Sequence, residues 1–218
     1  MADANYGFLV ARMEPANVAD EAEFNDWYDF EHVPQRLAIP GFLSAQRYVA
    51  PQGWPRYGAC YDLERADTTL STPYKAETGH AFSAWSKRVL GRVHPGWSRL
   101  DMEQVYPGRQ LVQSEWTGMT LLQFQGDAAG PVHDVAKRLA TISPLLQVRA
   151  FVGTAAPEPA AAIMLEAPAF ALLPAWDGPE LADRLGDLAA SLRVAHNYTR
   201  YSRRDALVGV LSRLEATK

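Results

Sequence analysis

Residues 24–42 have the sequence FNDWYDFEHVPQRLAIPGF and decide the local fold, which is a helix, a turn and the start of a strand. The helix is expected to begin near Asp20, whose carboxylate can cap the free N–H groups of the first turn. It should end just before Pro34, because proline lacks the N–H that would continue it. The strand 42–50 is then expected to follow the turn.

Outward from this segment, hydrophobic periodicity predicts two sets of elements, each in the order strand, helix, strand, strand, helix, strand. The first set has strands 6–13, 42–50, 56–63 and 99–106 and helices 20–33 and 73–93. The second set has strands 117–124, 146–152, 161–165 and 194–201 and helices 131–142 and 179–192. The predicted fold class is therefore α+β, with two ferredoxin-like βαββαβ units in tandem, 1–110 and 111–218.

A short internal repeat favours a duplication. Arg36-Leu37-Ala38 is followed by Arg47, and Arg138-Leu139-Ala140 is followed by Arg149 at the same spacing. Each unit would form an antiparallel sheet with both helices on one face. The two uncovered faces can then cover each other in a barrel-like pair, with a cavity between the sheets for a small apolar ligand.

The composition excludes several classes of function. The chain has 218 residues and a formal net charge of −4, so it lacks the basic surface of a nucleic-acid-binding protein. Cys60 is the only cysteine, which excludes an intrachain disulfide and a cysteine-based metal site. The N-terminus has no signal-peptide pattern and prolines interrupt the apolar stretch 160–175, so we expect a cytoplasmic protein that does not span a membrane.

Glu31 and His32 are the strongest candidates for chemistry. Glu31 lies in the aromatic stripe of the helix, so its carboxylate should be either desolvated or paired, for instance with Arg36 or Arg47. His32 lies four residues after Tyr28, on the same side of the helix. A histidine and a carboxylate beside tyrosines suit general acid–base catalysis. The alternative is that both side chains only satisfy the end of the helix.

The same residues carry a resemblance to a known family. The runs N-D-W-Y at 25–28, E-H-V-P at 31–34 and R-L-A-I-P-G-F at 36–42 are similar to the N-x-W-Y, E-H-x-P-x-R and P-G-F signature of EthD-like members of the dimeric α/β-barrel superfamily. The resemblance covers about 5–110. In the second half Asp134 stands where His32 would be repeated, so we expect one working site per chain or two unlike sites.

This resemblance implies a ferredoxin-like unit whose sheets pair into a barrel, often with a pocket between sheet and helices. The superfamily includes cofactor-free monooxygenases, isomerases, polyketide cyclases and haem enzymes, and the fold alone does not choose among them. The histidine of the E-H-x-P motif is the usual acid or base, which assigns that role to His32. Tyr28 would donate a hydrogen bond to a developing oxyanion, and Glu31 would orient the histidine.

Further side chains are expected to contact the substrate. They are Tyr6, Phe8, Trp27, Tyr61, His80, Trp85, Arg88 and His196. For His80 a surface position and for His196 a core or edge position are the alternatives. The histidines are scattered without metal-binding spacing, so no metal and no cofactor is expected.

Together these features predict a cofactor-independent enzyme that applies general acid–base chemistry to a small aromatic or apolar oxygenated metabolite. It would be a lyase, isomerase or cyclase, as in the catabolism of aromatic compounds. A cofactor-free or haem monooxygenase of the same fold and a non-catalytic small-molecule binding protein are the alternatives. The expected partner is a small-molecule substrate, not a nucleic acid or a membrane, with a homodimer as one option for assembly.

Overall fold

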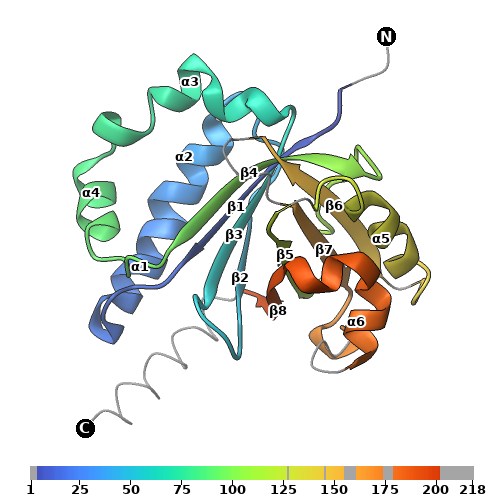
Figure 1. Ribbon diagram of the computed structural model, residues 1–218. Helices are drawn as coiled ribbons and strands as arrows, with labels where there is room; N and C mark the ends of the chain where they lie inside the picture. Colours follow the sequence, from blue (N-terminus) through green and yellow to red (C-terminus); the bar gives the residue numbers. More distant parts are fainter. Residues whose placement is uncertain (1–3, 127, 145, 155–160, 174–178, 202–218) are drawn as a thin grey trace, which may run out of the picture.

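The protein forms a closed barrel of eight antiparallel strands with helices on the outside (Figure 1). The computed structural model describes residues 4–126, 128–144, 146–154, 161–173 and 179–201. The strands are β1 Gly7–Met13, β2 Gln46–Val49, β3 Tyr57–Leu63, β4 Ser98–Tyr106, β5 Gly118–Phe124, β6 Gln147–Gly153, β7 Ala161–Ala167 and β8 Leu192–Arg200. The α-helices are α1 Glu21–Trp27, α2 Val33–Ala38, α3 Thr72–Lys75, α4 Ala84–Leu90, α5 Val132–Leu139 and α6 Pro179–Leu185.

Each half of the chain contributes four neighbouring strands to the barrel, in the same order. The first half runs β4-β1-β3-β2 and the second half β8-β5-β7-β6 around the barrel. The two sets join where β2 pairs with β8 and where β4 pairs with β6. The predicted α+β class, with two antiparallel sheets pairing into a barrel, is confirmed. The division near residue 110 stays a prediction.

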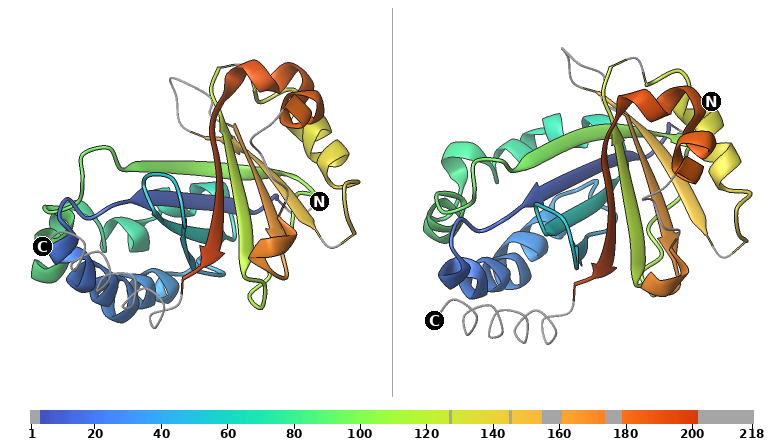
Figure 2. Two further views of the ribbon diagram at one scale, coloured as in Figure 1. Left: turned by 90° about the horizontal axis from the view of Figure 1, so that it is seen from below. Right: turned by 60° about the horizontal axis from the view of Figure 1, so that its bottom comes forward.

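The helices form two outer layers, one on each half of the barrel. The helices α1, α2 and α4 cover the outer face of the first sheet, and α5 and α6 cover that of the second, as Figure 2 shows from two further sides. Aromatic side chains of α1 pack against outward residues of β1 and β3. In the part of the chain that the structure describes, no helix has the length and apolar character needed to cross a membrane.

The interior of the barrel is a packed core. Alternation along β1 turns Phe8 and Val10 inward and Leu9 and Ala11 outward. Phe8 stacks on Phe151 of the second half, with ring centroids 4.1 Å apart. Side chains therefore fill the space between the two sheets, where a ligand cavity was expected.

The first long helix continues beyond the predicted end. A π-helix, Tyr28–His32, follows α1 directly, and α2 then runs to Ala38. Pro34 lies in the first turn of α2, a position where its missing N–H is tolerated. The π-helical turn changes the hydrogen-bonding pattern just before this proline, so the helix does not break.

The predicted helix 73–93 is instead three short pieces. The helix α3 ends at Lys75, a single 3-10 turn follows at Gly79–Ala81, and α4 begins at Ala84. Gly79 has a φ of 61°, a left-handed conformation that interrupts a right-handed helix. The Ser83 hydroxyl then caps α4 by accepting a hydrogen bond from the backbone N–H of Ser86 at 2.9 Å.

The two matching arginines of the internal repeat face opposite sides of the barrel wall. Arg47 points outward, with its guanidinium 4.5 Å from the Tyr28 ring. Arg149 points inward, toward the rings of Phe8 and Phe151. A shift of one residue along a strand exchanges its faces, so the arginine match in the sequence does not extend to equivalent side-chain positions.

Candidate functional site

A cavity of about 310 Å³ lies between the first sheet and its helices, and it contains His32. We call it the His32 cavity. Its walls come from β1, β3, the π-helix, α2, α3 and α4, and most of its lining side chains are apolar or aromatic, including Leu9, Met13, Phe42, Tyr61, Tyr74 and Phe82. The polar residues of the lining include His32, Arg36 and Arg99. This is the composition of a small-molecule site, a mainly apolar pocket with a few polar groups.

The helix places His32 and Arg36 on one side of the chain. They are four residues apart across the passage from the π-helix into α2, and residues at this spacing are neighbours on a helical surface. Short π-helical segments occur frequently at functional sites.

The imidazole of His32 is neutral at neutral pH. Burial and, to a smaller extent, the positive charges of Arg36, Arg47 and Arg99 together lower the pKa of His32 to about 3. The ring lies against Trp27, with centroids 4.3 Å apart. Its Nδ1 atom is buried and has no hydrogen-bond partner in the described part of the chain.

Arg36 is a buried cation with unused donors. Its side chain is 3% exposed, and Nη2 donates to the backbone carbonyl of Glu77 at 2.6 Å. The Nε and Nη1 atoms are buried without partners in the described residues. Burial lowers the pKa of Arg36, but an arginine still carries its charge at neutral pH.

Tyr61 adds a neutral hydrogen-bond donor. It lies on the outer face of β3, is 2% exposed, and its hydroxyl has no partner among the described side chains and backbone groups. Burial raises the pKa of this hydroxyl well above its usual value, so it stays protonated.

The His32 cavity thus brings together an imidazole, a guanidinium and a phenol, each with a buried polar atom that the described protein leaves unsatisfied. Buried polar groups in native proteins almost always have partners. A neutral imidazole can accept a proton, a guanidinium stabilises negative charge, and a phenol donates to an oxygen. The arrangement therefore suits the binding and deprotonation of an oxygen-containing ligand.

Of the three residues with predicted catalytic roles, Tyr28 and His32 lie in ring contact, with centroids 5.3 Å apart, whereas Glu31 faces α4. His32 lines the cavity, whereas Tyr28 is not among its lining residues and donates its hydroxyl to Met13 Sδ at 3.4 Å. Glu31 accepts hydrogen bonds from Ser83 at 2.6 Å and Ser86 at 2.8 Å. The expected contact from Glu31 to the histidine is therefore replaced by a contact from the π-helix to α4.

The expected pairing of Glu31 with an arginine is likewise replaced by other contacts. Arg47 forms its ion pair with Asp29, at 2.7 Å. Arg36 donates to a backbone carbonyl instead of a carboxylate.

Of the eight residues expected to bind substrate, Tyr61 lines the His32 cavity. Trp27 is buried in the helix layer and donates its indole N–H to Ser86 Oγ at 3.0 Å. Trp85 is half-buried and packs against the same apolar cluster. Phe8 faces the barrel interior.

The other four predicted residues lie elsewhere. His80 is exposed, and Arg88 forms a surface ion pair with Glu23 at 2.5 Å. Tyr6 packs against the Arg109 guanidinium, 4.3 Å from its ring. His196 faces Arg12 at 3.4 Å, and both burial and this charge lower its pKa.

Sequence reasoning missed the role of Arg36 as a lining residue. The sequence predicts an ion pair of Arg36 with Glu31 and no contact with the substrate, although its spacing of four from His32 places it on the same helical side. Tyr74 and Phe82 were also missed, because the prediction of a single helix 73–93 does not include the turns that bring their side chains to the cavity.

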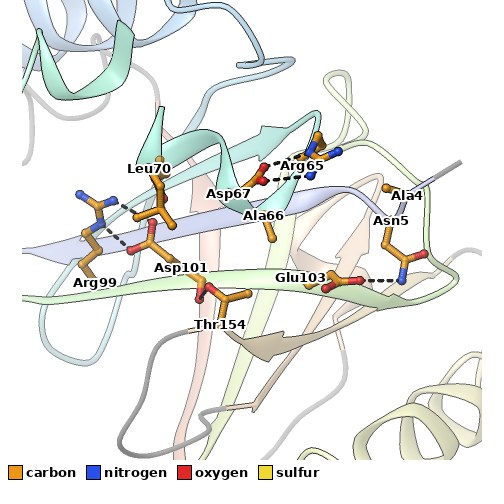
Figure 3. A pocket seen from close by; sticks show the side chains of 11 residues that line it. Ala4, Asn5, Arg65, Ala66, Asp67, Leu70, Arg99, Asp101, Glu103 and Thr154 are labelled. Atoms are coloured by element: carbon orange, nitrogen blue, oxygen red, sulfur yellow. Dashed lines mark hydrogen bonds and ion pairs between the residues drawn. The ribbon is translucent and has the colours of Figure 1, made fainter. Parts of the chain in front are cut away.

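A second, larger hollow of about 610 Å³ lies near the N-terminal end of β1 (Figure 3). Its charged side chains are paired with one another. Arg65 pairs with Asp67 at 2.9 Å, Arg99 pairs with Asp101 at 2.7 Å, and Asn5 donates to Glu103 at 3.0 Å. Dashed lines mark these three contacts in Figure 3. Since these groups already satisfy each other, we place the candidate site in the His32 cavity.

Within the described ranges, no group of three or more His, Cys, Asp or Glu side chains could hold a metal ion.

No protein-family model and no curated protein matches this sequence. Solved structures are similar to the fold. The structure of an anthrone oxidase-like protein aligns with 92% of this chain and with 93% of its own chain, with a TM-score of 0.63 and 9% sequence identity. For a novel haem-binding protein from Thermus thermophilus, the alignment covers 95% of this chain and 95% of the other, with a TM-score of 0.55 and 8% sequence identity. For a mutant chlorite dismutase from Candidatus Nitrospira defluvii, the alignment covers 96% of this chain and 97% of the other, with a TM-score of 0.50 and 8% sequence identity.

These similarities show the fold and nothing finer. The neighbours are dimeric α/β-barrel proteins, so the chain has the dimeric α/β-barrel fold expected from its sequence. Membership of the EthD-like group stays a prediction.

Proposed function

We propose that the chain is a cofactor-independent enzyme that moves a proton to or from a small aromatic or apolar oxygenated metabolite. The observation that carries this proposal is the neutral, buried imidazole of His32 in the wall of an apolar cavity. Lyase, isomerase and cyclase reactions can each use such a group as a general acid or base. That the structural neighbours include enzymes of this fold agrees with the proposal.

In this mechanism the apolar body of the substrate lies against Leu9, Phe42 and Phe82. His32 removes a proton from a carbon beside a substrate carbonyl group. The electron pair moves onto the carbonyl oxygen, where the Tyr61 hydroxyl donates a hydrogen bond to the negative charge that develops. The imidazolium then returns the proton at another position of the substrate.

The test is hydrogen–deuterium exchange on small aromatic carbon acids. The protein is incubated in D₂O with anthrone, 2-tetralone or phenylpyruvate, and loss of the acidic C–H signal is followed by NMR. We expect His32→Ala to reduce the exchange rate by about 10²- to 10⁴-fold. The matched control is His80→Ala, which removes an exposed histidine outside the cavity. A folded His32→Ala protein that keeps the full rate would refute the assignment.

An oxygen-dependent reaction is a second candidate, favoured by the similarity in fold to an anthrone oxidase-like protein. The same proton removal would then precede reaction of the substrate with O₂. An oxygen electrode separates the two functions, because only this candidate consumes O₂ in a His32-dependent way. Ligand-induced thermal stabilisation with neither exchange nor oxygen uptake would instead indicate a binding protein.

A haem does not fit the His32 cavity. The volume of about 310 Å³ is at the lower end of the range for drug-sized ligands, roughly 300 to 1,000 Å³, and a tetrapyrrole macrocycle is larger than such ligands. The haem-binding neighbour therefore supplies no step of this mechanism.

A further inference from the structure

We infer that Arg36 binds a carboxylate of the substrate, so that the natural substrates are small, mainly apolar organic acids. This inference rests on the proposed function of the His32 cavity and names its substrate class. It starts from the hydrogen bonds of the buried arginines.

Three other arginines that are buried or half-buried have a carboxylate partner. Arg47 pairs with Asp29, Arg149 with Asp62 at 2.6 Å and Glu166 at 3.0 Å, and Arg56 with Glu14. For Arg36, the described part of the chain provides no ion pair. A buried cation without an anion is unfavourable, because burial removes its water, and the hydrogen bond to the Glu77 carbonyl replaces only part of the lost interactions.

Arg12 is a buried arginine whose three nitrogens all form hydrogen bonds within the protein. Among the residues that the structure describes it has no ion pair either, but each of its nitrogens has a partner: Nε donates to Tyr198, Nη1 to Gln123 and Nη2 to the Trp54 carbonyl. Arg36 differs because, within the described ranges, Nη2 is the only nitrogen that donates, while Nε and Nη1 have no partner. These unused donors match the two oxygens of a carboxylate.

The second arginine of the cavity does not compete for this role. Arg99 already pairs with Asp101 at 2.7 Å and donates to the Tyr74 hydroxyl at 2.5 Å. The surroundings of Arg36 also suit the charged end of an aromatic acid, since its guanidinium lies 5.2 Å from the centre of the Tyr74 ring, which stacks with Phe42.

The carboxylate would also act on the base. The charge of Arg36 is one cause of the low pKa of His32, and a bound anion cancels part of that charge. The imidazole then accepts a proton more readily when an acid occupies the cavity than when a neutral molecule does. The negative charge of the substrate would thus have two effects: it favours binding at Arg36, and it makes His32 a stronger base.

The test compares two probes of nearly equal shape, 2-naphthoate and 2-naphthamide, by isothermal titration calorimetry. The unaltered protein should bind the acid roughly tenfold or more tightly than the amide. Arg36→Gln should remove this preference and leave the amide affinity unchanged, and Arg36→Lys should keep part of it. Arg65→Gln, which removes an exposed arginine of the second hollow, is the matched control and should change neither affinity.

Two readouts guard against a merely structural effect. Circular dichroism should show that Arg36→Gln is folded, and if it is not, the comparison uses Arg36→Lys. An NMR titration should show that the acid, but not the amide, raises the pKa of His32. Equal affinities for acid and amide in the unaltered protein, or an acid preference that survives Arg36→Gln, would overturn the inference.

The outcomes distinguish this inference from the proposed function. An Arg36-dependent preference for acids without His32-dependent exchange would leave the carboxylate site standing and remove the enzymatic role. His32-dependent exchange of 2-tetralone without any preference for acids would do the reverse.

Discussion

The carboxylate of Glu31 and the hydroxyl of Ser83 lie 2.6 Å apart, although 52 residues separate them in the sequence. Ser86 donates to the same carboxylate oxygen, at 2.8 Å. Ser83 also caps the first turn of α4. Glu31 therefore fixes α4, which covers the His32 cavity, to the π-helix that carries the histidine. It is a positioning residue.

Glu31→Ala should lower the free energy of unfolding by about 1.5–3 kcal/mol, because two hydrogen bonds to a charged group are lost. Urea denaturation measures this change. The matched control is Glu23→Ala, which breaks ion pairs of exposed arginines and should cost less than about 1 kcal/mol. If both variants lose the same stability, the link between the π-helix and α4 is not important.

Tyr61→Phe should keep or increase the stability of the empty protein while it weakens ligand binding. The hydroxyl it removes is buried and has no partner in the described residues, and an unsatisfied buried group costs about 1–3 kcal/mol. Tyr57→Phe is the opposite case, because that hydroxyl donates to Glu21 and accepts from Asn25. Thermal unfolding with and without 2-naphthoate tests both, and a strongly destabilised Tyr61→Phe would contradict the expectation.

His32 should make the protein less stable in acid. Its folded pKa of about 3 lies below the value of about 6.5 for an unfolded histidine. Between these values the unfolded chain binds a proton that the folded protein does not, so stability falls as the pH decreases from about 6.5 to about 3, by up to about 1.4 kcal/mol per pH unit. His32→Gln should flatten the pH dependence of unfolding in this window, and a curve parallel to that of the unaltered protein would count against a neutral buried histidine.

Arg149→Met should destabilise the barrel by about 3–5 kcal/mol, because it leaves two carboxylates buried without their cation. Combining it with Asp62→Asn and Glu166→Gln should recover much of this loss, since the uncompensated charges are then removed as well. Unfolding in urea measures both steps. A loss no greater than that of the exposed control Arg65→Met would show that this network contributes little.

The sequence predicted the strands well and the helices less well. Alternation and turn residues placed seven of the eight strands within two residues of their observed bounds, as with Tyr57–Leu63 against the predicted 56–63. The predicted strand 42–50 is the exception, because β2 covers only Gln46–Val49. Whether a helix continues or is interrupted depends on single positions, and hydrophobic periodicity does not detect their effect. Gly79 interrupts one predicted helix, and the π-helix before Pro34 carries another one past its predicted end.

The faces of the central strands could not be read from the sequence. The strands β1 and β3 are buried along their whole length, with one face in the barrel and the other under the helices. Such strands show no polar alternation to identify the cavity side. For this reason Phe8, which faces the barrel interior, was expected in the site, while its neighbour Leu9 was not.

His32 could be predicted as a site residue from a recognisable sequence motif, but the roles of its neighbours could be assigned only from the tertiary structure. The partner of an arginine is decided by which carboxylates the fold brings near it. Arg47 forms an ion pair with Asp29, whereas the hydrogen-bond partner of Arg36 among the described residues is the backbone carbonyl of Glu77. Nothing local distinguishes these two arginines, which lie on consecutive elements.

The closure of the barrel within one chain also affects how the protein can change over time. The two halves belong to one covalent chain. They are joined in the barrel where β2 pairs with β8 and where β4 pairs with β6. In a barrel made from two identical chains every substitution is made twice, so a cavity that grows on one side grows on the other. Here the first half keeps the cavity, while Val132, Val135 and Leu139 of α5 pack tightly in the second. One half is thus free to specialise in chemistry while the other supports it.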